Sequence, residues 1–120
     1  MLFRKFSKSL KFASLGFRFF IRERNIKIHL GAALTVILLG LFFGISSLEW
    51  VAIILSICLV ISLEIVNTVI EEAMDLLNSE KNVKVMIVKD LSAAAVFVSA
   101  IGSIFVGLLV FIHYILKMLQ

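Results

Sequence analysis

Proline is absent from this 120-residue chain, and charged residues make up only 17% of it. The lack of proline removes the residue that most often breaks a helix, so long helices are expected. The apolar fraction is 62%, whereas a soluble domain has about 45–50%. A chain of this length cannot bury so much apolar surface as a water-soluble monomer. The composition therefore excludes a soluble domain and a disordered segment, and it predicts that lipid forms part of the solvent.

Several chemical signatures are also missing. The single cysteine, Cys58, excludes an intramolecular disulfide scaffold. The chain has no phosphate-binding GxxxxGK(S/T) loop, no Rossmann glycine pattern and no catalytic Ser-His arrangement, so no soluble-kinase motif is present. Nucleic acid is not an expected partner despite the net charge of +4, because no basic segment would be free of the membrane surface.

Three apolar segments are long enough to cross a bilayer. They run from about residue 28 to 46, from about 50 to 69 and from about 93 to 116. Each is near the ~20 residues that a helix needs to cross a hydrocarbon layer about 30 Å thick. An eight-stranded barrel does not fit in 120 residues, so helices are the expected spanning elements. The predicted fold is an all-α integral membrane protein with one membrane-embedded domain.

The segment before the first span, residues 1–27, is amphipathic. An apolar stripe recurs at steps of three and four, formed by Phe3, Phe6, Leu10, Ala13, Phe17 and Phe20. Six basic residues lie on the other side, namely Arg4, Lys5, Lys8, Lys11, Arg18 and Arg22. This pattern predicts a helix in the bilayer interface with its basic side toward the headgroups. A signal peptide is the weaker alternative, because the long apolar run begins late and no small-residue cleavage site follows it.

Lysine and arginine are distributed unevenly around the spans. Eight of the twelve precede the first span, none lies between the first two, three lie between the second and third, and one follows the third. Cytoplasmic segments are the ones enriched in these residues. The alternation predicts that the N-terminus and the 73–90 loop are cytoplasmic and that the C-terminus is extracytoplasmic.

Polar residues gather at the cytoplasmic end of the second span. Glu64, Asn67, Glu71 and Asp75 lie at i, i+3, i+7 and i+11, which places them within about 80° of one another on a helix. Burying Glu64 and Asn67 in hydrocarbon costs several kcal/mol unless each has a partner or faces water. One interpretation is catalytic, with Glu64 accepting a proton from a lipid alcohol and the later acids holding a hard cation such as Mg²⁺. The other is a polar packing device between helices, with the later acids solvating a helix end.

A second polar group follows in the chain. Glu80, Lys81 and Asn82 come first, and Lys89 and Asp90 stand where the third span is expected to begin. A lysine at this place can meet a phosphate, whereas Asp90 suits the N-terminal end of a helix. From these residues alone, a topology signal with a helix cap is at least as good an interpretation as a phosphate site.

Two other features favour solvation or packing when taken alone. Glu23 is the one acid before the first span, among eight bases, and such an acid usually forms a surface ion pair. Small residues repeat every four positions in two spans and let helix backbones approach closely; they are Gly40 and Gly44, and Ala95, Ser99, Ser103 and Gly107. Three spans make a thin bundle around Glu64, so an oligomeric bundle is expected.

The run Glu64-Ile-Val-Asn67-Thr-Val-Ile-Glu71-Glu-Ala-Met-Asp75 resembles the signature of the bacterial diacylglycerol kinase and undecaprenol kinase family. Nearly the whole chain resembles the family in layout. It has the family's surface helix, its three spans and its Lys-Asp pair before a small-residue run, here Lys89-Asp90. The resemblance implies a homotrimeric kinase of the bacterial cell membrane. Such a kinase uses MgATP to phosphorylate a lipid alcohol, with its active site on the cytoplasmic side.

The resemblance also implies roles for single residues. Glu64 matches the proton acceptor, which meets the lipid substrate, and Asn67 matches its neighbour in the site. Glu23 and Glu71 match the carboxylates that bind the ATP-associated metal, which reverses the ion-pair interpretation of Glu23. The family's nucleotide-contacting stretch corresponds to Glu80, Lys81, Asn82, Lys89 and Asp90.

The sequence departs from the family pattern in two places. The segment between Gly16 and Glu23 is one residue short, which shifts the helix phase by about 100°, so the resemblance does not place the residues before Gly16. The 76–88 loop also lacks the histidine common there. The stretch from Glu23 to His29 is more similar to the undecaprenol kinases of Gram-positive bacteria, so undecaprenol is the expected substrate and diacylglycerol the alternative.

Two functions of other classes fit less well. A proton-coupled transporter needs a polar path on both sides of Glu64, but residues 50–63 offer only Ser56 and Ser62. A helical scaffold without enzymatic activity does not explain why the acidic residues share one side of the second span. A membrane lipid kinase is therefore the function that the sequence favours.

Overall fold

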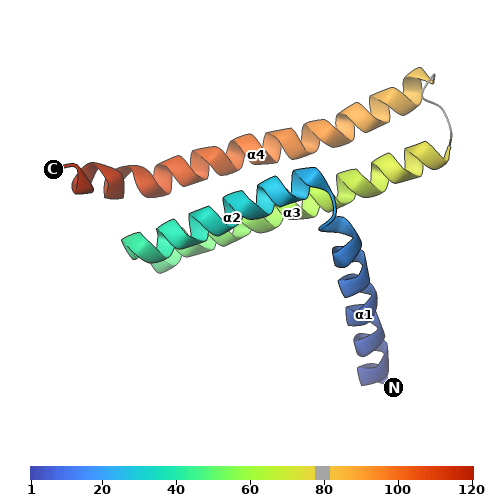
Figure 1. Cartoon of the computed structure of the whole chain (residues 1–120), viewed down its shortest axis with the longest axis horizontal. Helices are drawn as coiled ribbons and strands as arrows, with labels where there is room; N and C mark the ends of the chain where they lie inside the picture. The colour runs from blue at the N-terminus through green and yellow to red at the C-terminus, as the bar shows by residue number, and fades with distance from the viewer. Residues whose placement is uncertain (78–81) are drawn as a thin grey trace.

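Figure 1 shows the computed structural model of the chain, which describes residues 1–77 and 82–120. Four helices follow one another in the chain: α1 (Leu2–Phe20), α2 (Arg24–Phe43), α3 (Ser47–Leu76) and α4 (Val83–Met118). No strand occurs in the described residues. The last three helices are each long and apolar enough to cross a membrane. The predicted all-α architecture with three candidate spans is thus confirmed.

Helix α1 projects sideways from the other three helices (Figure 1). The chain turns after Phe20, because the backbone of Glu23 is extended and caps the start of α2. The sequence predicted one helix over residues 1–27 and a first span from residue 28, so both boundaries lie several residues earlier in the structure. Phe20 is buried beside the turn, whereas Phe3 and Phe6 are exposed. An exposed apolar face with basic residues opposite is what an interfacial helix requires.

Helices α3 and α4 run antiparallel and form the most extensive helix pair of the described chain (Figure 1). A cluster of buried apolar residues holds them together at the end where α3 begins and α4 ends; it comprises Ile45, Ile53, Val110 and Phe111. At the same end the Tyr114 hydroxyl donates a hydrogen bond of 2.6 Å to Glu49 Oε2. Glu49 also accepts from the backbone N–H of Ser46 at 2.8 Å, so one carboxylate caps α3 and ties it to α4.

The segment between the second and third spans is more helical than the sequence predicted. The expected 73–90 loop overlaps the end of α3, which continues to Leu76, and the start of α4, which begins at Val83. Asn82 caps α4, because its Oδ1 accepts a hydrogen bond of 2.9 Å from the backbone N–H of Lys84. Asp90 therefore lies inside α4, and its predicted place at the start of a helix is wrong. No proline or glycine lies between this cap and Asp90 to stop a helix.

The two glycines of the GxxxG pattern have different roles. A Cβ atom at Gly40 would lie 2.7 Å from Cη2 of Trp50 and 3.1 Å from Cδ1 of Ile45. Gly40 therefore allows α2 to approach the start of α3 within the same chain. Gly44 follows the last residue of α2 with a φ of 62°, a left-handed conformation that glycine adopts at low cost.

The close approach at Gly40 leads to a stability prediction. We expect Gly40→Ala to lower the free energy of unfolding by about 1–3 kcal/mol, because the new methyl group overpacks the contact with Trp50. Gly31→Ala is the matched control on the same helix, since a Cβ there meets nothing within 4 Å. Unfolding in detergent can be followed by the fluorescence of Trp50, the only tryptophan. Equal midpoints for the two variants would contradict the packing role of Gly40.

Candidate functional site

The centre of the candidate site is Glu64, a carboxylate within the apolar helix α3. Its residue is only 6% exposed. Glu71 follows it by two turns on the same helix, Glu23 stands at the start of α2, and His29 lies on α2. The sequence predicted that Glu23, Glu64 and Glu71 belong to one site. The structure places Glu64 and Glu71 on α3 and Glu23 at the start of α2, and their sharing of one site stays a prediction.

Asn67 follows Glu64 by one turn and is also buried, at 9% exposure. Its Nδ2 donates a hydrogen bond of 3.2 Å to Oε1 of Glu71. Its Oδ1 accepts a hydrogen bond from the hydroxyl of Ser92 on α4. Asn67 is thus bonded on both sides, to an acid of its own helix and to the neighbouring helix. The sequence predicted that Asn67 shares one side of the helix with Glu64, Glu71 and Asp75, here called the acidic stripe, and the bond to Glu71 agrees with that placement. The bond to Ser92 was not predicted.

Two carboxylates of this region, those of Glu71 and Glu23, are hard oxygen donors of the kind that Mg²⁺ prefers. Glu71 is exposed, and Glu23 is half-buried with a side chain that forms no capping hydrogen bond to α2. Mg²⁺ is usually held by one or two carboxylates together with substrate phosphates. In residues 1–77 and 82–120, no group of three or more acidic, histidine or cysteine side chains is placed so that it could hold a metal ion by itself. Phosphate oxygens would therefore have to complete the coordination.

The nucleotide residues implied by the resemblance are only partly placed. Lys89 forms an ion pair with Asp75, which joins α4 to the last turns of α3. Asp90 is exposed on α4, and the side chain of Asn82 is engaged in capping that helix. Glu80 and Lys81 lie outside the described residues. The structure thus links Lys89 to the acidic stripe through Asp75, but it shows no contact that joins Asn82 or Asp90 to Glu64.

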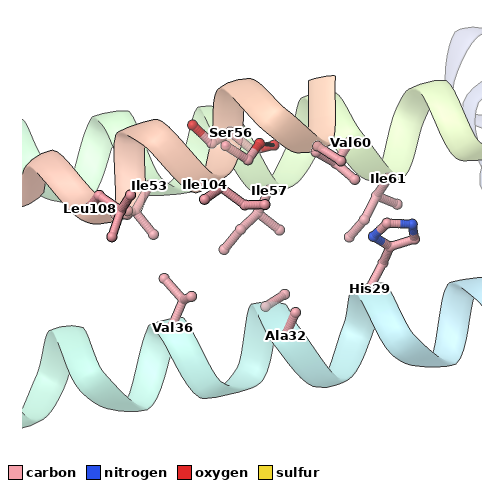
Figure 2. A pocket seen from close by; sticks show the side chains of 14 residues that line it. His29, Ala32, Val36, Ile53, Ser56, Ile57, Val60, Ile61, Ile104 and Leu108 are labelled. Atoms are coloured by element: carbon pink, nitrogen blue, oxygen red, sulfur yellow. Dashed lines mark hydrogen bonds between the residues drawn. The ribbon is translucent and has the colours of Figure 1, made fainter. Parts of the chain in front are cut away.

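An apolar pocket of about 410 Å³ lies between α2 and the α3–α4 pair. Figure 2 shows His29 at one end of this pocket, with Ala32 and Val36 following along α2. The opposite wall is formed by isoleucine, valine and small residues of α3 and α4, among them Val60 and Gly107. Since Val60 lies one turn before Glu64 on α3, the pocket ends close to the buried carboxylate.

Two residues of this region were missed by the sequence reasoning. They are His29 and Ser92, for which the sequence predicted no role in the site. Ser92 bonds across helices to Asn67, 25 residues earlier in the chain, and His29 lines the pocket from α2. Helical spacing relates residues of one helix only, so it contains no signal for either placement.

The family match spans every residue of the candidate site. The model of the family described as prokaryotic diacylglycerol kinase matches residues 11–111. An undecaprenol kinase of Bacillus subtilis (strain 168) is 39% identical over 90 residues, which are 75% of this chain and 73% of that protein. A diacylglycerol kinase of Synechocystis sp. is 31% identical over 101 residues, which are 82% of this chain and 58% of that protein. The chain therefore belongs to the prokaryotic diacylglycerol kinase family and is a membrane lipid kinase.

Proposed function

We propose that this protein transfers the γ-phosphoryl group of ATP to undecaprenol, giving undecaprenyl phosphate and ADP. The observation that carries the proposal is the buried Glu64 near the end of an apolar pocket that a hydrocarbon chain can occupy. The similarity to an undecaprenol kinase at 39% identity supports the polyprenol. Diacylglycerol is the alternative acceptor, supported by the similarity to a diacylglycerol kinase at 31% identity.

In the proposed reaction Glu64 acts as the general base. Its carboxylate accepts the proton of the lipid hydroxyl while the hydroxyl oxygen forms a bond to the γ-phosphorus and the bond to the ADP oxygen breaks. Asn67 lies beside this carboxylate and orients the acids around it. The lipid alcohol stays in the bilayer throughout, because its tail lies along the pocket while its hydroxyl reaches the polar end.

The nucleotide is proposed to bind beside the acidic stripe. Glu23 and Glu71 would hold the Mg²⁺ that accompanies ATP, and this ion, when bound, neutralises charge on the phosphates. Further nucleotide contacts are proposed for the residues implied by the family resemblance, namely Glu80, Lys81, Asn82, Lys89 and Asp90. Lys89 is well placed for this role, because it lies across from the last turns of α3.

The topology and assembly also remain proposals. We infer a multi-pass protein of the bacterial cell membrane with a cytoplasmic N-terminus and active site and an extracytoplasmic C-terminus. The alternating numbers of lysine and arginine residues around the three candidate spans support this orientation. A homotrimer is proposed from the family resemblance. Large apolar residues exposed along α2, α3 and α4 leave surface for contacts with further copies as well as with lipid.

The direct test of the proposed function is phosphate transfer from radiolabelled ATP to added lipid. The purified protein is assayed in detergent micelles that contain either undecaprenol or diacylglycerol at the same mole fraction. We expect label to enter undecaprenol at the higher initial rate and to depend on Mg²⁺. A higher rate with diacylglycerol would assign the alternative substrate, and no transfer to either lipid would contradict the proposal.

The pocket makes a separate prediction about the lipid tail. Gly107 lines the pocket, and a Cβ there meets nothing within 4 Å, so Gly107→Leu should fold while its side chain fills part of the pocket. We expect the KM for undecaprenol to rise by about 10-fold, equivalent to ~1.4 kcal/mol, with an unchanged KM for MgATP.

Gly102→Leu is the matched control for this substitution. Gly102 lies on the same helix and is exposed outside the pocket, and a Cβ atom added there would also meet nothing within 4 Å. Both variants gain the same helix propensity, so a difference between their KM values for undecaprenol is due to the pocket. The same KM for undecaprenol in both variants would contradict a tail-binding role.

A further inference from the structure

We infer that Ser92 is a positioning residue of the phosphoryl-transfer site, which acts through Asn67 on Glu71. The inference rests on the proposed function, because Glu71 is proposed there as a ligand of the ATP-associated metal. Ser92 is half-buried on α4, and its hydroxyl donates to Oδ1 of Asn67 on α3. No role for Ser92 was expected from the sequence, and it is not one of the acidic or basic groups of the site.

The two hydrogen bonds of Asn67 define one orientation of its amide group. Oδ1 accepts from Ser92, which leaves Nδ2 to donate to Oε1 of Glu71 at 3.2 Å. An amide has an acceptor on one side and two donors on the other. If the amide were reversed, its oxygen would face the carboxylate oxygen of Glu71, which cannot donate when ionised. Glu71 therefore selects which way the amide faces, and Ser92, which donates to the other end of the amide, holds Asn67 in the place from which it binds Glu71.

This arrangement orders Glu71 before a nucleotide arrives. Glu71 is exposed, and an exposed glutamate has many accessible rotamers, so holding it in one place costs conformational entropy. A hydrogen bond from a buried amide, itself held by a second helix, favours one position of the carboxylate. Residues that orient metal ligands typically change metal affinity by about 10–100-fold when they are removed. The expected consequence is on MgATP binding more than on the chemical step.

A purely structural serine of the same helix provides the comparison. Ser99 is buried at 8% exposure, and its hydroxyl donates to the backbone oxygen of Val96, one turn earlier in α4, at 2.7 Å. A serine can therefore satisfy its hydroxyl on this helix without a partner on α3. The bond of Ser92 to Asn67 instead crosses from α4 to α3, at the level of the acidic stripe.

The test compares three variants, Ser92→Ala, Ser92→Thr and Ser99→Ala. Equilibrium binding of MgATP is measured by titration of the detergent-solubilised protein without lipid, and steady-state kinetics are measured with undecaprenol. We expect Ser92→Ala to weaken MgATP binding and raise the KM for MgATP by about 10-fold, with a smaller change in kcat. Ser92→Thr keeps the hydroxyl and should restore both values. Ser99→Ala should behave as the wild type in both assays.

The outcomes separate this inference from the proposed function. Unchanged MgATP binding in Ser92→Ala, an equal effect in Ser99→Ala, or a failure of Ser92→Thr to restore binding would each overturn the positioning role. A wild-type protein that labels no lipid alcohol would overturn the proposed function instead. The binding titration still decides the role of Ser92 in that case, because it requires no turnover.

Discussion

Glu64→Gln is expected to reduce lipid phosphorylation by at least ~10², because the loss of a general base typically costs about 10²–10⁴ in rate. Glutamine preserves the shape of the side chain but cannot accept the proton of the lipid hydroxyl. The fold should be retained, since a neutral amide is less costly to bury than a carboxylate, and Glu64 is only 6% exposed. MgATP binding should also persist, because the acids proposed to hold the metal are unchanged.

Three measurements on one preparation test this expectation: the oligomeric state in detergent, MgATP binding and phosphate transfer to lipid. Glu72→Gln is the matched control, because Glu72 is an exposed acid on the same helix and its substitution removes the same charge. A Glu64→Gln protein with full activity would remove the assignment of the base. An unfolded one would favour the alternative in which Glu64 is a polar packing residue of the helices.

The spacing of polar residues on α3 predicted that they share one side of a helix. Glu64, Asn67 and Glu71 lie on one continuous helix, so the geometry of a regular helix was sufficient to place them on one side. The bond between Asn67 and Glu71 follows from their separation of four residues. Hydrophobic length likewise predicted three candidate spans, because an apolar run of this length leaves few structural choices.

Contacts between helices were not predictable in the same way. The hydrogen bond from Ser92 to Asn67, and that from Tyr114 to Glu49, depend on how α4 lies against α3. Many rotations and shifts of one helix against the other satisfy the same apolar pattern. The bend at Glu23 and the early start of α4 were also missed. In both places the boundary is set by the backbone or side chain of a capping residue within a polar stretch, where hydrophobic periodicity gives no signal.

Substitution of either proposed metal ligand should have a second large effect, on MgATP binding. We expect Glu71→Gln and Glu23→Gln each to weaken MgATP binding by at least ~10-fold, since loss even of a residue that only orients a metal ligand costs about 10–100-fold. Each substitution removes a hard anionic oxygen that Mg²⁺ prefers, and turnover should fall as well. In Glu71→Gln the amide of Asn67 can still donate to the remaining side-chain oxygen. The effect of this variant therefore reports on charge rather than on the local hydrogen bond.

Titration of MgATP at several fixed concentrations of free Mg²⁺ distinguishes a metal ligand from a residue that only supports the fold. A lost ligand should be compensated in part by more Mg²⁺, because mass action restores occupancy of a weakened site. A structural defect has no such dependence on the ion. Glu72→Gln again serves as the control, with wild-type binding expected at every Mg²⁺ concentration. If Glu23→Gln or Glu71→Gln keeps wild-type binding, or loses binding to the same extent at all Mg²⁺ concentrations, that residue is not a metal ligand.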